Sequence, residues 1–383
     1  MEKQRRDFIK KIATITAGIS LTDVARASMA VPKQLSLQKE WIKDAGMEMS
    51  NAYFSGITAN QQLIALAKQM DALGAVAGIN PSVADLRNAK PWEYHTIVGV
   101  KEAWKKQGLN FNVVEGPPCL GEQTKLGLSG RDEEIDRFIL FMKNLKRAGI
   151  DIICYNWMPV ISWARTSFNR PGRGGALMTA FDYSDLKNKP LTKYGEISKD
   201  VLWDNLTYFL KAVVPEAEKI QMKLALHPDD PQVDSIQGIS RIMNTVESFD
   251  RMLNIMPSDC NGITLCQGNF SLMGTDIPSL IRRWGKAGKI HFVHFRNVKE
   301  LSGEIPSTKF TETFHDEGDI DMYQAMKAYY EVGFKGPIRP DHVPTMAGEE
   351  NTFPGYMTLG NLFAIGYIRA LAEAVTKEAM HQA

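Results

Sequence analysis

Eight short runs of β-branched and other apolar residues recur along this chain of 383 residues, and segments with a helical period follow most of them. Parallel strands need crossover connections that are usually helical, so this alternation predicts repeated βα units and a parallel sheet. Eight such units form an α/β fold of the TIM (β/α)8 barrel type, whose active site lies at the carboxyl ends of the strands. The expected strands are residues 48–54, 75–79, 110–115, 151–156, 222–227, 262–266, 290–295 and 337–341.

Amphipathic segments between these runs supply the expected helices. In residues 131–149, Ile135, Phe138 and Met142 lie on one helical face, and Gly149 ends the segment. The same spacing of apolar residues predicts further helices over 202–219, 236–254, 277–287, 322–332 and 359–379. The last of these would close the ring of helices around the barrel.

One connection, residues 167–200, differs from the others because it has no clear period and contains a glycine-rich, basic stretch. It is longer than ordinary βα and αβ loops of about 2–6 residues. Two interpretations are open. The segment is either a lid, from which Arg170 and Arg173 reach a substrate carboxylate, or a solvated excursion on the surface.

The first thirty residues have the layout of a signal peptide. Arg5 and Arg6 precede a weakly apolar run over 12–21 and small residues around Ala30, as in a twin-arginine-type signal. We therefore expect a signal at 1–30, a linker at 31–47 and a single barrel at 48–383, with export to the periplasm. The alternative is a basic first helix on a cytoplasmic protein. A membrane-spanning helix is not expected, since it needs roughly 20 apolar residues.

Charge and cysteine content narrow the classes of partner. The chain has 45 Lys and Arg against 44 Asp and Glu, a net charge of +1, which gives no overall positive field for a nucleic-acid backbone. A small-molecule ligand is expected instead, and a homo-oligomer is compatible with this composition. The cysteines are too few for a disulfide framework, so each is interpreted alone, with Cys119 and Cys154 as core or loop thiols.

Potential metal ligands end the last four expected strands, namely His227, Cys266, His294 and Asp341. Each by itself has an ordinary structural explanation, such as a hydrogen-bonded histidine, a core thiol or a helix cap. One βα unit separates each from the next, so a barrel would bring all four to the same mouth. This convergence predicts a metal site. A thiolate and two histidines suit Zn²⁺ or Fe²⁺, and the carboxylate also admits Mn²⁺.

Further polar residues follow the same strand ends. Arg296 could hold a substrate carboxylate in bidentate fashion, while His342 and Tyr356 could transfer protons. Asp229 and Asp230 follow His227, and we expect them to cap the helix that comes next rather than to act in catalysis.

Several of these residues lie in motifs through which the sequence resembles the mannonate dehydratase family from about residue 48 to its end. The motifs are Ile-Cys-Tyr-Asn-Trp-Met-Pro-Val, Ala-Leu-His-Pro-Asp-Asp-Pro, Asn-Gly-Ile-Thr-Leu-Cys-Gln-Gly, His-Phe-Arg and Arg-Pro-Asp-His.

The resemblance implies a xylose-isomerase-like barrel lyase that converts D-mannonate to 2-keto-3-deoxy-D-gluconate in hexuronate catabolism, using Mn²⁺ or Fe²⁺. It also implies that the four residues above are the metal ligands. It places Arg296, His342 and Tyr356 near the substrate, where the last two would exchange protons at C2 and at the C3 hydroxyl.

Two stretches depart from the family pattern. Residues 117–124 read Pro-Pro-Cys-Leu-Gly-Glu-Gln-Thr where the family has Pro-Val-His-Glu-Asp, and Val343-Pro344 replaces Gly-His. These changes bear on which sugar acid is the substrate.

Two alternatives stay open, a metal-dependent sugar isomerase or epimerase on the same barrel and a non-catalytic exported sugar-acid-binding protein. Isomerase sites usually use paired carboxylates, and Glu115 is the only glutamate at an expected strand end.

Overall fold

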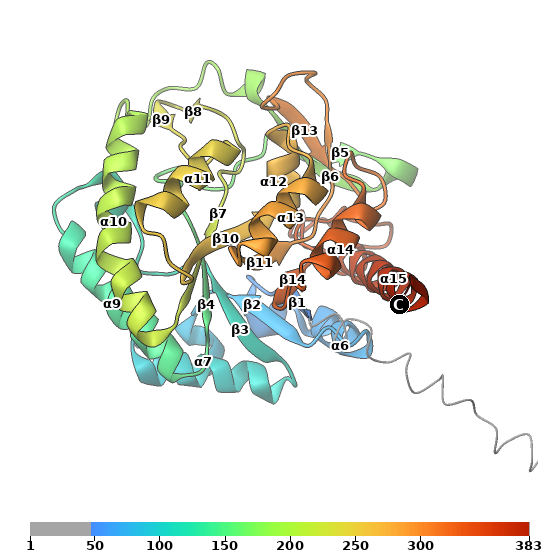
Figure 1. Ribbon diagram of the computed structural model, residues 1–383, viewed down its shortest axis with the longest axis horizontal. Helices are drawn as coiled ribbons and strands as arrows, with labels where there is room; N and C mark the ends of the chain where they lie inside the picture. The colour runs from blue at the N-terminus through green and yellow to red at the C-terminus, as the bar shows by residue number, and fades with distance from the viewer. Residues whose placement is uncertain (1–46, 383) are drawn as a thin grey trace, which may run out of the picture. The chain divides into compact units, whose positions relative to one another are not determined.

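The computed structural model describes residues 47–382, whose central feature is a closed barrel of eight parallel strands (Figure 1). The expected signal at 1–30 and all but the last residue of the expected linker lie outside the described residues. The prediction of a TIM (β/α)8 barrel is confirmed. Around the barrel the strands are β1 (Glu48–Ala52), β2 (Gly74–Ala77), β3 (Asn110–Glu115), β4 (Ile152–Asn156), β7 (Lys223–His227), β10 (Asn261–Cys266), β11 (Ile290–His294) and β14 (Pro337–Arg339).

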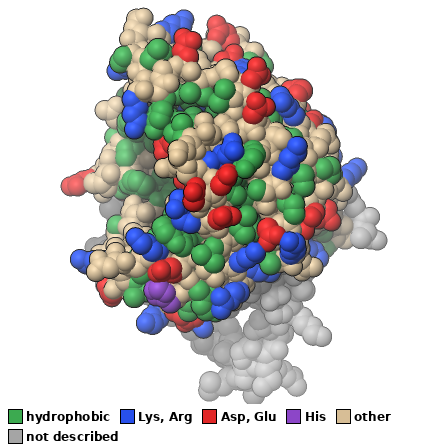
Figure 2. Space-filling view, turned by 90° about the vertical axis from the view of Figure 1, so that its left-hand side faces the viewer, with side chains coloured by type: hydrophobic (Ala, Val, Ile, Leu, Met, Phe, Trp, Pro, Cys, Tyr) green, Lys and Arg blue, Asp and Glu red, His purple; other side chains and the backbone are tan. Residues whose placement is uncertain are grey.

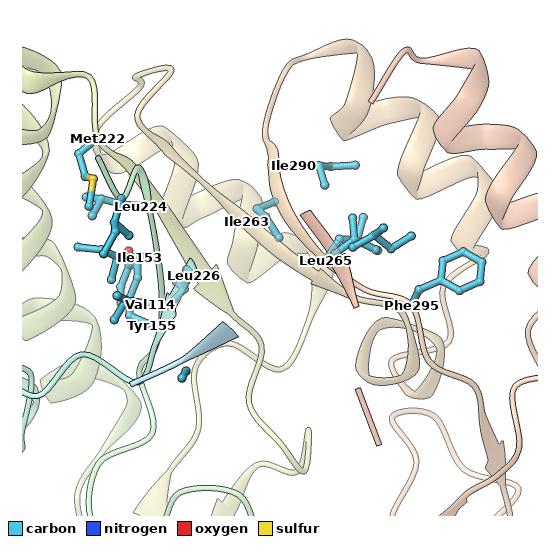
Figure 3. Close-up of a cluster of buried hydrophobic side chains, with 14 of the residues drawn as sticks. Val114, Ile153, Tyr155, Met222, Leu224, Leu226, Ile263, Leu265, Ile290 and Phe295 are labelled. Atoms are coloured by element: carbon cyan, nitrogen blue, oxygen red, sulfur yellow. The ribbon is translucent and has the colours of Figure 1, made fainter. Parts of the chain in front are cut away.

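Alternation of side chains along these strands separates the barrel interior from the layer under the helices. One buried cluster joins Val76, Val113, Ile152, Cys154, Ala225 and Phe292, which face the barrel axis. The residues between them, such as Val114, Ile153 and Leu224, belong to the larger core outside the barrel (Figure 3). Because successive residues alternate, each interior row continues two residues later at the mouth, where it reaches His227 and His294.

The helices surround this barrel, and several begin at a side-chain cap. Ser198, Thr245, Asp276 and Asp321 each accept a hydrogen bond from a backbone N–H of the first helical turn. The helices are α5 (Gly56–Ala59), α6 (Gln61–Gln69), α7 (Tyr94–Lys106), α8 (Glu122–Leu126), α9 (Arg131–Arg147), α10 (Lys199–Ile220), α11 (Val246–Ile255), α12 (Gln267–Leu272), α13 (Ile277–Lys286), α14 (Met322–Glu331) and α15 (Thr358–Gln382), with short 3-10 turns at Pro81–Ala84, Arg173–Gly175 and Tyr183–Asp185.

The prediction of a helix over 236–254 was wrong for the first half of this range. A two-stranded hairpin, β8 (Ser235–Ile236) and β9 (Ile239–Ser240), comes first, and α11 begins only after Thr245. Gln237 and Gly238 form its turn with φ of 49° and 85°, a pair of left-handed conformations that a helix cannot contain. The glycine therefore ends any helical continuation at this point.

The connection over 167–200, for which no regular structure was expected, begins with two strands. It supplies β5 (Ser167–Pro171) and β6 (Leu177–Asp182), which pair with β12 (Val298–Glu300) and β13 (Lys309–Glu312) in a four-stranded antiparallel sheet of order β12-β13-β6-β5. We call this the outer sheet; it lies at the upper right of Figure 1. Phe181, Val298 and Phe310 belong to its own buried cluster.

The surface of residues 47–382 agrees with the charge balance of the sequence. Acidic and basic side chains are interspersed over the face shown in Figure 2. In this part of the chain no helix combines the length and apolar character needed to cross a bilayer.

Candidate active site at the barrel mouth

A cavity of about 360 Å³ opens at the carboxyl ends of the barrel strands, the end at which TIM-barrel enzymes carry their active sites. Its floor is polar and its sides are largely aromatic. The lining residues are Phe54, Glu115, Gly116, Cys154, Tyr155, Asn156, Met158, Ser162, Trp163, His227, Asp230, His294, Arg339, Asp341, His342, Phe353, Pro354 and Tyr356.

Of the residues predicted to bind a metal, His227, His294 and Asp341 line this floor, and Cys266 is buried beside them. One potential ligand atom each from His227, Cys266 and His294 lies within 4.8 Å of the other two. His227 Nε2 is 3.1 Å from His294 Nδ1. Asp341 is adjacent, since its Oδ2 lies 3.6 Å from Cys266 Sγ and 3.5 Å from His294 Nδ1.

The electrostatics of this group favour the charged forms that bind a cation. Burial alone would raise the pKa of the Cys266 thiol, but the guanidinium of Arg296, with contacts from both histidines, lowers it to about 5. Burial also opposes ionisation of Asp341, yet its cationic neighbours hold its pKa well below the usual range. A thiolate and a carboxylate therefore face each other at neutral pH, an arrangement that a divalent cation would stabilise.

The two imidazoles also suit a metal. His227 Nδ1 lies 2.7 Å from the carbonyl of Pro228, which fixes the proton on Nδ1 and leaves Nε2 free to coordinate. The side chain of His294 is buried, and its Nδ1 faces His227 and Asp341 while its Nε2 lies 3.6 Å from Glu115 Oε2. Burial and Arg339 act to lower the pKa of His294, but Asp341 and Glu115 raise it well above its usual value, so a bound cation would take the place of its proton. Two imidazoles, a thiolate and a carboxylate make a donor set that fits a divalent transition metal.

Glu115, Cys154 and His294 form a second possible group on the same floor. It fits a metal less well. Burial and the charge of Glu115 raise the pKa of the Cys154 thiol to about 11, so this sulfur stays protonated. The Glu115 carboxylate already pairs with Arg339, whose Nη2 lies 2.9 Å from its Oε1.

Asp341 separates the ligand group from two proton-transfer candidates. Its Oδ1 accepts from Arg339 at 2.7 Å and lies 3.4 Å from Tyr356 Oη and 3.8 Å from His342 Nε2. The backbone of Asp341 has a φ of 68°, an uncommon conformation for a residue other than glycine. This local geometry turns one oxygen toward Cys266 and the other toward the Tyr356 side.

His342 and Tyr356 both line the cavity, as the sequence predicted, and both are neutral. Burial lowers the pKa of His342 to about 3, and Arg296 adds to this effect against the opposing charge of Asp341. Enclosure and the charge of Asp341 raise the pKa of Tyr356 well above its usual value. The two rings meet edge to face, with centroids 5.0 Å apart.

Arg296 is near this site but does not line the cavity. Its Nε donates to Cys266 at 3.1 Å, and its Nη2 donates to Asp230 at 3.0 Å and Asn269 at 2.7 Å. Its Nη1 donates to Glu312. Every nitrogen of its guanidinium already has a buried partner, an arrangement that favours support of the site over the expected direct contact with a substrate carboxylate.

Arg339 is the guanidinium on the cavity wall, and it is not among the residues predicted from the strand ends. Its side chain is 1% exposed, its two terminal nitrogens bond Asp341 and Glu115, and its Nε has no partner. A signal for it existed. Arg339 is the last residue of β14 and lies two residues before the predicted ligand Asp341.

The two aspartates after His227 do not cap a helix, contrary to expectation. Asp230 is buried and receives two hydrogen bonds from Arg165, at 2.6 and 3.0 Å. Asp229 accepts from the backbone of Met243 at 2.7 Å, which anchors the loop after the β8–β9 hairpin. The hairpin separates both aspartates from α11, so neither can reach the start of that helix.

The other predicted residues lie away from the floor. Arg173 pairs with Asp316 at 2.9 Å on the surface and does not line the cavity. Residues 117–124, which depart from the family pattern, contribute nothing to the cavity lining, and Cys119 is buried. Val343 pairs with the backbone of Gly355 and so ties the strand end to the segment that carries Tyr356.

Comparisons with known proteins agree with this geometry. The family model D-mannonate dehydratase (UxuA) matches residues 47–193 and 185–382. The mannonate dehydratase of Streptococcus agalactiae serotype V is 37% identical over 326 residues, covering 78% of this chain and 92% of that protein. The protein of the same name from Thermotoga maritima is 33% identical over 344 residues, covering 81% and 94%.

Among solved structures, a mannonate dehydratase is likewise similar to this chain. The crystal structure of mannonate dehydratase from Streptococcus suis serotype 2 aligns with a TM-score of 0.78 at 31% identity, covering 87% of this chain and 94% of that one. A structure of L-ribulose 3-epimerase aligns with a TM-score of 0.53 at 12% identity, covering 88% and 97%, and shares the fold alone. A xylose isomerase domain protein from Planctomyces limnophilus also aligns at 0.53, which confirms the xylose-isomerase-like barrel type.

Proposed function

This chain belongs to the D-mannonate dehydratase family and is a hydro-lyase, and we propose that it converts D-mannonate to 2-keto-3-deoxy-D-gluconate with a divalent metal at His227, Cys266, His294 and Asp341. One observation carries the proposal. Asp341 faces the other potential ligands through Oδ2 and the proton-transfer candidates Tyr356 and His342 through Oδ1. A metal centre and an acid–base pair therefore share one carboxylate.

Mn²⁺ or Fe²⁺ is the proposed metal, and the donor set also admits Zn²⁺. When bound, such an ion supplies positive charge where negative charge develops on the substrate carboxylate as C2 loses its proton. Cys266 and Asp341 would hold the ion as anions, and His227 presents Nε2 to it because its Nδ1 is committed to a backbone carbonyl.

Removal of water from an aldonic acid requires two proton movements. One of His342 and Tyr356 takes the proton from C2, and the other donates a proton to the hydroxyl leaving C3, so that water departs and a C2–C3 double bond forms. The enol then tautomerises to the 2-keto acid. Positioned acids and bases of this kind typically contribute about 10²–10⁴-fold to the rate. Arg339 places a fixed positive charge on the same wall.

The remaining cavity suits a polyhydroxy acid. Phe54, Trp163 and Phe353 form apolar sides above the charged floor, a combination common in small-molecule sites. The alternative of a sugar isomerase or epimerase finds less support, since those enzymes usually use paired carboxylates. Here Glu115 already pairs with Arg339.

The test is an assay of purified protein loaded with Mn²⁺, Fe²⁺ or Zn²⁺ against a panel of aldonic acids, with 2-keto-3-deoxy product as the readout. We expect turnover of D-mannonate and one metal ion per chain. Ketose or epimer products from free sugars would favour the isomerase reading. Binding of D-mannonate without product under every metal would favour a non-catalytic sugar-acid-binding protein.

We also propose that residues 1–30 act as a twin-arginine-type export signal, because paired Arg5 and Arg6 precede a weakly apolar run. Full-length protein produced in a bacterium with a functional twin-arginine pathway should reach the periplasm, and Arg5→Lys/Arg6→Lys should retain it in the cytoplasm. Cytoplasmic retention of the unaltered chain would instead support the alternative of a basic first helix.

A further inference from the structure

A buried ion-pair cluster lies directly behind His342, and we propose that Glu312 is the positioning residue that fixes this imidazole for proton transfer. The inference rests on the proposed function, since His342 has an acid–base role only if the site dehydrates a sugar acid. It adds a residue from the outer sheet to a site otherwise built from the barrel. Neither the sequence motifs nor the strand ends pointed to Glu312.

The orientation of the imidazole carries the argument. His342 Nδ1 lies 2.6 Å from Glu312 Oε1 and 2.9 Å from Arg296 Nη1. Arg296 Nη1 already donates to the same Glu312 oxygen, and the carboxylate is the nearer partner of the ring nitrogen, so Nδ1 donates to Glu312 in a strong, charge-assisted hydrogen bond. The proton on that nitrogen therefore points at Glu312, which leaves Nε2 as the nitrogen on the side of Asp341 and the cavity. In a catalytic cycle only the bond between Nε2 and a proton forms and breaks, while the Nδ1–H bond to Glu312 persists.

Glu312 is itself held rigidly. Its side chain is 1% exposed, and Arg165 donates to Oε1 at 2.7 Å. Arg296 donates to the same oxygen, and Thr179 donates to Oε2. Both carboxylate oxygens have partners in fixed places, so Glu312 cannot turn away from His342 without breaking several buried charge-assisted hydrogen bonds.

The outer sheet places Glu312 and Thr179 beside the barrel mouth. Glu312 is the last residue of β13, and Thr179 lies on β6, which pairs with β13 through Ala180 and Thr311. The packing of Phe181 against Phe310, with ring centroids 5.7 Å apart, stabilises this pairing. The segment after β4 that forms β5 and β6 therefore contributes to the candidate active site. Through Thr179 and Glu312 it supports the imidazole of His342 from behind.

A purely structural role is the competing explanation, because Arg165 and Arg296 need acidic partners wherever they are buried. Asp230 already bonds both guanidinium groups, at 2.6 and 3.0 Å from Arg165 and 3.0 Å from Arg296. The direct bond to His342 is what distinguishes Glu312 from Asp230. The test must therefore separate effects that pass through His342 from effects on the cluster as a whole.

Glu312→Gln is the principal variant, since it keeps the shape of the side chain and removes its charge. Changing a group that orients a metal-ligating histidine typically costs about 10–100-fold in activity, and we use the same range for the orientation of His342. We expect kcat to fall by about that factor with little change in KM or in metal content. Thr179→Val should lower kcat less. Glu300→Gln on the neighbouring strand β12 is the matched control, because Glu300 bonds Ser302 and Ser307 and should leave kcat unchanged.

A double-mutant cycle with His342→Ala gives the decisive result. If Glu312 acts through His342, then Glu312→Gln should have no further effect on kcat in the His342→Ala background. Equal losses in both backgrounds, or loss of metal in proportion to activity, would overturn the proposal. If Glu312→Gln does not fold, the same cycle with Thr179→Val decides between these outcomes.

Nitrogen-15 NMR of labelled histidine separates this inference from the proposed function, because it does not require turnover. His342 should carry its proton on Nδ1 in the unaltered protein and shift toward the other tautomer in Glu312→Gln. Protonation on Nε2 in the unaltered protein would sink the positioning role even if the enzyme is active. Absence of turnover with every aldonic acid would sink the proposed function and leave the NMR result as it stands.

Discussion

The two halves of the barrel mouth are built from the same kind of strand end but carry different chemistry. Strands β7, β10, β11 and β14 end at or just before His227, Cys266, His294 and Asp341, all potential metal ligands. The ends of β1, β3 and β4 supply mainly apolar or neutral lining, with Glu115 as the charged exception. The second half of the chain thus contains the proposed reaction centre, and the first half shapes the space beside it.

Two cysteines make the contrast specific. Cys266 and Cys154 are both buried and face the barrel axis, yet their thiols have opposite shifts in pKa, to about 5 and about 11. Cys266 bonds Arg296, whereas Cys154 is beside Glu115 and accepts from Thr264 at 3.2 Å. The neighbouring charge, and not the residue type or its burial, decides which sulfur can bind a metal.

Replacement of these two cysteines should give the largest difference between the halves. Cys266→Ala removes the only thiolate of the proposed ligand set, so we expect loss of bound metal and a fall in kcat/KM of more than about 10³-fold. Cys154→Ala should retain the metal and most of the activity. Metal content by mass spectrometry and initial rates check both. Full metal content and activity in Cys266→Ala would contradict the four-ligand proposal.

His342→Ala and Tyr356→Phe should separate catalysis from metal binding. Both side chains lie on the Oδ1 side of Asp341, so each variant should keep its metal and lose about 10²–10⁴-fold in kcat. Steady-state kinetics on metal-loaded protein provides the measurement. A loss of metal in either variant would mean that the two sides of Asp341 are not independent.

Acidification should release the metal only at low pH. The pKa of Cys266 lies below its usual value, so the thiolate is already present above about pH 5 and is lost as the pH falls through that value. Metal content after equilibration should therefore be constant from pH 8 to about pH 6 and decline below about pH 5. Release beginning near pH 8 would show that the thiol has an ordinary pKa and that Arg296 does not act on it as described.

Phe54→Ala should give the smallest effect, because it changes the shape of the first half without touching its charges. Phe54 contacts Tyr356 edge to face with ring centroids 5.4 Å apart and is 37% exposed. Loss of part of this apolar wall should raise KM by about 3- to 10-fold, roughly 1 kcal/mol, with little change in kcat. A fall in kcat comparable to that of Tyr356→Phe would show that Phe54 holds the phenol in place.

Local pattern was sufficient for the barrel and for the residues at its strand ends. Alternation along a strand and the length of a βα unit are short-range properties, so they place His227, Cys266, His294 and Asp341 at one mouth without any knowledge of contacts. The same reasoning reached His342 and Tyr356, which line the cavity. It failed over 236–254, where two left-handed residues form a hairpin in place of a helical turn.

Only the tertiary structure determines which charged side chains form ion pairs with one another. Nothing near Arg296 in the sequence shows that Asp230, Asn269 and Glu312 occupy its donors. Arg339 and Glu115 are likewise partners across more than half of the chain. Charged side chains become partners when the barrel closes and the outer sheet packs against it. No short-range pattern in the sequence predicts these pairs.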